Sequence, residues 1–102
     1  HEKEFYEIGY YLKDAVKGKH DVDGKYLIYD GYNAQNLFYV RLLNDQNKKI
    51  SFKNWTELSE GDEVIASQNN VKSYVEENYL YDVTNTHFTI KTYKINGRKQ
   101  QK

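Results

Sequence analysis

The feature that most constrains the fold is the alternation of apolar and polar residues within residues 36–65. Residues 37–43 and 48–53 each alternate as a strand with one buried face does, and a polar segment, residues 44–47, separates them. Residues 58–65 then read as a turn that leads into another strand. This order predicts a β-meander with one apolar face.

The register of this meander follows from the side chains that it would bury. The inward set consists of apolar residues at alternate positions: Phe38, Val40, Leu42, Ile50 and Phe52. A shift by one residue would bury Arg41 and Lys49 in their place, so one register is strongly favoured.

Further strands are predicted on either side of the meander. Lys25–Asp30 is apolar on both faces, which is typical of a central strand. Phe5–Val16 fits helical spacing and strand alternation equally well, and its tyrosines together with Gly9 favour a strand. Residues 83–86 read as a turn, and residues 87–95 read as the last strand.

One helix is expected. The spacing of apolar residues over 71–79 predicts it, with Asn69 or Asn70 as the N-cap. The chain of 102 residues suits one domain with one core, which we place at residues 1–97. Residues 98–102 are expected to form a disordered basic tail. Together the elements predict a mainly β fold, namely a small OB-like five-stranded barrel or a meander with one short helix. A sheet packed against one helix is the alternative.

Composition excludes several kinds of site. The chain has no cysteine, so disulfide bonds and thiolate metal sites are excluded. Lys+Arg and Asp+Glu both number 15, and a protein that binds phosphates in general is usually more basic than this. No apolar run approaches the ~20 residues of a membrane span, and no signal peptide is recognisable. No motif implies a cofactor.

The motifs that resemble catalytic or metal sites are incomplete. His20-Asp21-Val22-Asp23-Gly24 has part of the spacing of a calcium loop but lacks the bidentate Glu near its end, so a solvated loop is favoured. His20 and His87 are far apart in the sequence, and no serine or cysteine nucleophile motif accompanies them. Glu76 and Glu77 fit the solvated face of a helix better than an acid–base pair. We therefore expect no metal site and no enzymatic activity.

Exposed aromatic and basic side chains give the strongest functional prediction. They are Tyr29, Tyr32, Tyr39, Arg41, Lys49 and Lys53. On the predicted meander, the members from residues 37–43 would lie across from those of residues 48–53, and the first two tyrosines would extend this surface. Rings among cations on an exposed sheet are what single-stranded nucleic acid binders use. A surface or edge that binds another protein fits the pattern as well, and so does an ordinary solvated face.

Four segments within residues 48–77 share a pattern with a known family. They are Lys48-Lys49-Ile50-Ser51-Phe52, Leu58-Ser59-Glu60-Gly61, Val64-Ile65-Ala66 and Val71-Lys72-Ser73-Tyr74-Val75-Glu76. In this order they resemble the small Gram-positive YxeA-type proteins, whose function is uncharacterised. The resemblance implies an exported or membrane-tethered domain with an OB-like barrel, and it implies no catalytic residues.

The function that we expect is that of a non-enzymatic binding or interaction domain. It would belong to an exported or membrane-tethered bacterial protein, and its partner would be another protein. The alternative is a cytoplasmic single-stranded nucleic-acid-binding protein of a phage or mobile element. The 11 tyrosines suit both a half-buried sheet and a contact surface.

Overall fold

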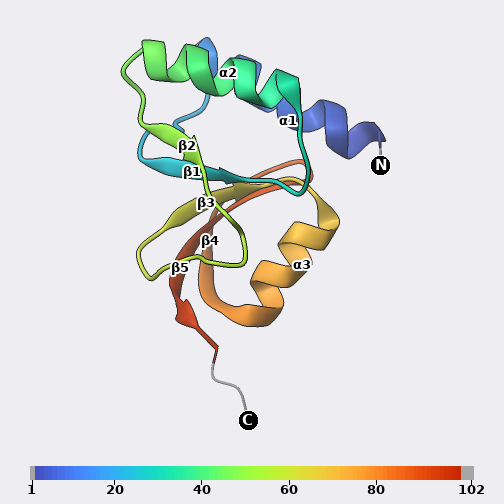
Figure 1. Ribbon diagram of the computed structural model, residues 1–102, viewed down its shortest axis with the longest axis vertical. Helices are drawn as coiled ribbons and strands as arrows, with labels where there is room; N and C mark the ends of the chain where they lie inside the picture. The colour runs from blue at the N-terminus through green and yellow to red at the C-terminus, as the bar shows by residue number, and fades with distance from the viewer. Residues whose placement is uncertain (1, 100–102) are drawn as a thin grey trace.

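A computed structural model describes the backbone of residues 2–99 and the side chains of residues 7–99, and Figure 1 shows its elements. Their order is α1 (Glu2–Val16), β1 (Lys25–Ile28), α2 (Ala34–Asp45), β2 (Ile50–Phe52), β3 (Glu63–Ala66), α3 (Asn69–Asn78), β4 (Tyr79–His87) and β5 (Ile90–Arg98). The strands form one sheet in the order β2-β1-β3-β5-β4. β1 runs parallel to β2 and β3, whereas β5 runs antiparallel to β3 and β4.

The fold is a small mixed α/β domain, so the prediction of a mainly β fold is only partly right. The five-stranded sheet is confirmed, but it is open rather than closed into a barrel, and the described residues form three helices rather than one. The predicted meander is wrong as well. β1 and β2 are parallel neighbours, and a parallel pair needs a crossover connection, which α2 supplies.

Helices cover both faces of the sheet: α1 and α2 lie on one face and α3 on the other (Figure 1). The alternation of strand side chains explains both layers. Leu27 of β1 and Ile65 of β3 pack with α1 and α2, whereas Ile28 and Val64 pack with α3. The prediction that residues 25–30 contain a central strand with two apolar faces is therefore confirmed, although the strand ends at Ile28.

Residues 37–43, predicted as a strand, lie in α2. Asn33 caps this helix, because its Oδ1 accepts hydrogen bonds from the backbone N–H groups of Gln35 (2.9 Å) and Asn36 (3.3 Å). The side chains that α2 buries recur at helical spacing: Asn36, Val40 and Leu43. Phe38, which was expected to point inward, is 56% exposed.

Residues 5–16, for which a strand was favoured, form most of α1. The described side chains that this helix buries also recur at helical spacing: Ile8, Tyr11, Leu12 and Ala15. They join the core that lies between α1, α2 and the sheet. The tyrosines that favoured a strand lie on different faces of the helix, since Tyr11 is buried and Tyr10 is exposed.

The C-terminal part is a long hairpin rather than a turn followed by one strand. Residues 83–86 lie within β4, and the chain reverses at Phe88, which has a positive φ of 57°. β5 continues to Arg98, whose Nη2 donates a hydrogen bond to the Tyr79 hydroxyl at 2.9 Å. Arg98, the first residue of the expected disordered tail, therefore belongs to the sheet, and residues 100–102 of that tail lie outside the described residues.

Several local predictions are confirmed. α3 lies where the helix was expected, although Gln68 rather than Asn69 or Asn70 is its N-cap, and Gln68 makes no capping bond with its side chain. β2 lies within residues 48–53, which were predicted as a strand, and β3 begins within residues 58–65, which were predicted as a turn that leads into a strand. Within residues 2–99, none of the helices has the length and apolar character that crossing a membrane requires.

Candidate functional site

The six residues predicted to bind do not share one surface. Three of them line the same cleft: Tyr29, Tyr32 and Lys53. Tyr39 borders a separate groove between α1 and α2, while Arg41 of α2 and Lys49 before β2 are exposed outside both. The sheet face that was expected to unite them is not formed, because residues 37–43 are helical.

The cleft lies where the carboxyl ends of β1 and β2 meet the N-terminus of α2, and we call it the aromatic cleft. It is lined by Tyr29, Gly31, Tyr32, Asn33, Asn36, Leu37, Phe52, Lys53 and Asn54. Its volume of about 420 Å³ is within the range of small-molecule sites. In open sheets with parallel strands, ligands bind outside the carboxyl ends of the strands. The cleft therefore has the position at which such sheets bind ligands.

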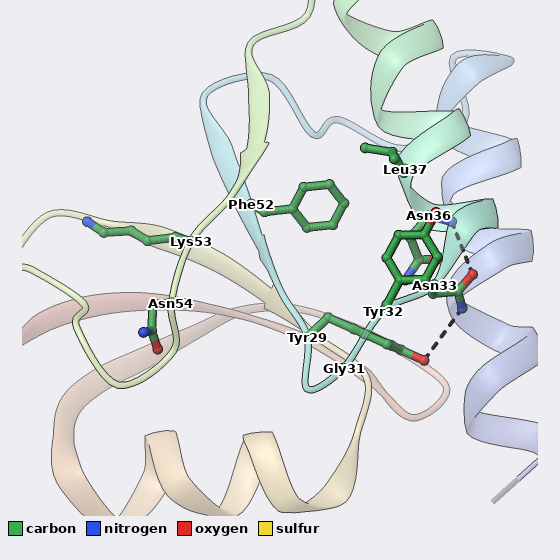
Figure 2. Close-up of a pocket in the computed structure, with 9 residues that line it drawn as sticks. All are labelled: Tyr29, Gly31, Tyr32, Asn33, Asn36, Leu37, Phe52, Lys53 and Asn54. Carbon is green, nitrogen blue, oxygen red and sulfur yellow. Dashed lines mark hydrogen bonds between the residues drawn. The ribbon is translucent and has the colours of Figure 1, made fainter.

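Aromatic side chains stand on opposite sides of this cleft. Figure 2 shows Phe52 pointing from β2 toward Leu37 of α2 and toward Tyr32 on the loop after β1. Phe52 was expected to be buried, but it is 44% exposed, because β2 is a short strand at the edge of the sheet. Tyr32 is 79% exposed. Large exposed rings that face one concavity are typical of a binding site.

Two asparagines at the start of α2 differ in how their amides are used. Asn33 uses both polar atoms: Oδ1 caps the helix, and Nδ2 donates to the Tyr29 hydroxyl at 3.5 Å (Figure 2). Asn36 is 1% exposed, and neither its Oδ1 nor its Nδ2 has a hydrogen-bond partner among the described residues. Buried amides are nearly always hydrogen-bonded, and an unpaired one costs about 1–3 kcal/mol. Asn36 therefore brings an unused donor and an unused acceptor to the cleft.

The charge of the cleft is nearly neutral. Its cation, Lys53, forms an ion pair with Asp62 at 2.5 Å, and the Lys53 ammonium lies 5.0 Å from the centre of the Tyr26 ring. The Asp62 carboxylate also accepts a hydrogen bond from the backbone N–H of Ser59 at 2.8 Å, so it is fixed in place. No carboxylate and no histidine is among the lining residues named above.

A second, polar pocket combines residues that the sequence keeps far apart. His20 stacks on Tyr11 with ring centres 4.2 Å apart, and it lies edge-on to His87 at 4.7 Å. Burial lowers the pKa of His20, and the proximity of His87 lowers it further. The adjoining pocket has a volume of about 290 Å³ and carries side chains of both charges, including Lys19 and Glu63. Among the described residues, no group of three or more His, Asp or Glu side chains is placed so that it could hold a metal ion.

A sequence signal for the aromatic cleft was present but was not used. Asn33 lies four residues before the apolar run that begins at Leu37, as an N-cap lies shortly before the apolar face of a helix, and it follows a strand and the turn at Asp30-Gly31. Read as strand, turn and helix, this segment places Tyr32 and Asn36 together at the carboxyl end of β1. No comparable signal pairs His20 with His87, because only the tertiary structure brings them together.

No family model, no curated protein and no solved structure matches this chain.

Proposed function

We propose that this chain is a non-enzymatic binding domain that holds a small, flat ligand in the aromatic cleft. One observation carries the proposal: the exposed rings of Phe52 and Tyr32 face the same concavity at the carboxyl ends of two parallel strands. Burying aromatic surface between rings is favourable both through the apolar area removed from water and through stacking. A flat ligand between these side chains would be stabilised both by the burial of apolar surface and by stacking.

The chemistry of the lining favours binding over catalysis. Acid–base catalysis needs a titratable group within hydrogen-bond reach of the substrate, most often His, Asp or Glu. The residues that line the cleft include none of these, and Lys53 is engaged in the ion pair with Asp62. The groups that remain are rings and amides, which bind and orient a ligand.

A strand of single-stranded nucleic acid is the second candidate, since stacking of bases on Phe52 and Tyr32 would favour it. Such a strand also needs cations along its phosphates. Lys53 is neutralised by Asp62, and Arg41 and Lys49 lie outside the cleft. This arrangement supports one small ligand better than a nucleic acid strand.

Two further proposals rest on the sequence alone: that the protein is exported or tethered to the cell envelope, and that it binds another protein. Export or tethering to the cell envelope rests on the resemblance of residues 48–77 to YxeA-type proteins. Fractionation of cells that carry the full-length gene tests it, since a protein found wholly in the cytoplasmic fraction would exclude export.

A titration of ¹⁵N-labelled protein with small ring compounds tests the binding proposal. The panel contains nucleosides, monosaccharides and aromatic amino acids. We expect one class to shift the amide signals of residues 29–37 and 52–54. Phe52→Ala should weaken its binding about tenfold, because a stacked ring contributes about 1–3 kcal/mol.

The matched control is Phe38→Ala, because Phe38 is a comparably exposed ring on α2 that does not line the cleft. It should leave the affinity unchanged. The proposal fails if no compound shifts these amide signals, or if the two substitutions weaken binding equally.

A further inference from the structure

We infer that the ligand of the aromatic cleft is a nucleobase or nucleoside whose hydrogen-bonding edge is read by the Asn36 amide. This inference rests on the proposed function, because it names the class of flat ligand that the cleft takes. The inference depends on Asn36, whereas the proposed function depends on the exposed rings, so the inference can fail while the proposed function stands.

The burial of Asn36 is the first step. The residue is 1% exposed at the cleft, in the first turn of α2, and both polar atoms of its amide lack a partner among residues 7–99. An apolar side chain of similar size would fill this position without leaving a donor and an acceptor unpaired. A ligand that supplies the complementary acceptor and donor would satisfy both atoms at once.

The geometry of an amide selects the kind of group that can do this. Its oxygen and nitrogen lie in one plane at a fixed spacing, so the best partner presents an acceptor and a donor side by side in the same plane. The edges of nucleobases have this arrangement, and asparagine pairs with the N6 and N7 atoms of adenine in this way. The hydroxyl groups of a sugar ring are not coplanar, so a sugar would satisfy the amide less well.

The walls of the cleft fit the faces of the same ligand. Phe52 and Tyr32 approach from different segments, with Phe52 directed across the cleft (Figure 2). A base inserted between them would stack on aromatic rings while its edge points at Asn36. The Asn33 amide is already engaged, since it caps the helix and bonds to Tyr29, and the Gln35 side chain lines the separate groove with Tyr39 rather than the cleft.

The charge of the cleft argues against phosphate as the recognised group. Lys53 is paired with Asp62, and the Asn33 side chain already occupies the backbone N–H groups of Gln35 and Asn36. A phosphate would lack the cations that its binding requires. The base or nucleoside part is therefore the group that the cleft recognises.

Methylated nucleosides test this inference without changing the protein. Adenosine, uridine, guanosine and cytidine are titrated into the ¹⁵N-labelled protein beside forms whose edge is blocked, such as N6,N6-dimethyladenosine and 3-methyluridine. At least one parent nucleoside should shift the signals of residues 29–37 and 52–54. It should bind about tenfold more tightly than its blocked form, because the methyl groups of the blocked form prevent its edge from pairing with the Asn36 amide.

Asn36→Leu provides the second arm, since it keeps the number and branching of the side-chain heavy atoms and removes the polar ones. Parent and blocked nucleosides should bind this variant equally, whereas Phe52→Ala should weaken both. The ¹⁵N spectrum shows whether the leucine variant is folded, and if it is not, the comparison of parent and blocked nucleosides on the unchanged protein decides.

Three results would overturn the inference. Equal binding of parent and blocked nucleosides by the unchanged protein would show that the edge is not read. Binding of monosaccharides or aromatic amino acids, with no binding of nucleosides, would exclude the ligand class and leave the binding function in place. If no ring compound in the panel binds, the inference and the proposed function fail together.

Discussion

At the scale of single residues, His20 has an unusual environment for a titratable side chain. Its ring lies against Tyr11 and His87, and its Nε2 is buried with no hydrogen-bond partner in the described part of the chain. Burial is the main cause that lowers the pKa of His20. The proximity of His87 and Lys19 lowers it further, and Asp14 opposes them. The folded protein therefore binds a proton at His20 less readily than the unfolded chain does.

This environment predicts a pH dependence of stability. His20 has an ordinary pKa of 6.5, so between its lowered pKa and pH 6.5 the unfolded chain binds more protons than the folded protein. The free energy of unfolding should therefore rise with pH across this window. The stability that neutral His20 contributes above the window should be lost as the pH falls through it. Urea denaturation at about pH 7.5 and about pH 5 measures the change.

His20→Phe is the control, because it keeps a ring against Tyr11 and removes the titrating group. Its stability should change less between the two pH values than that of the unchanged protein. Equal changes in the two proteins would show that His20 does not contribute.

The sequence identified part of the candidate site at this scale. Tyr29, Tyr32 and Lys53 were predicted as aromatic and basic side chains on, or extending, an exposed sheet face, and all three line the cleft. Asn36 was not selected, because its burial depends on how α2 packs on the sheet. A sequence shows which residues can donate and accept hydrogen bonds, but only the folded structure shows which of them are left without a partner.

At the scale of elements, α2 shows why the alternating pattern was misread. Residues 37–43 are apolar at nearly every position, so they fit the two-residue period of a strand as well as the 3.6-residue period of a helix. The Asn33 cap selects the helix, and its packing then exposes Phe38 and buries Val40 and Leu43. The runs that form β1 and β3 are too short for a helix of several turns, and they were correctly predicted as strands.

Two alanine substitutions in α2 distinguish the helix from the predicted strand. Leu43 is 0% exposed, so Leu43→Ala should lower the free energy of unfolding by about 2–5 kcal/mol through lost burial and the cavity that remains. Phe38 is 56% exposed, so Phe38→Ala should change it by about 0.5 kcal/mol or less. Urea denaturation of both variants measures these values. The predicted strand would reverse the order, since it buries Phe38 and exposes Leu43.

At the scale of the whole molecule, one misread element changes the topology. With residues 37–43 as a strand, every neighbouring pair is antiparallel and the elements order themselves as a meander. With these residues as a helix, the chain can cross over and place β2 parallel to β1. β3 then pairs with the other edge of β1, which leaves β1 in the interior of the sheet. Local patterns could not predict this order, because strand pairing depends on contacts between distant residues.

This topology predicts where the molecule is most resistant to opening. β1 and β3 have strands on both sides, and both of their faces are covered, so their amides should exchange with solvent only through global unfolding. β2 and β4 are the edge strands, and β4 is largely exposed, so their amides should exchange faster. Native-state hydrogen exchange followed by NMR measures this for Leu27 and Ile65 against residues of β4. If β4 were protected as strongly as β1, a partner or a second copy of the chain would have to cover that edge, and repeating the experiment at several protein concentrations would show which segment becomes protected on association.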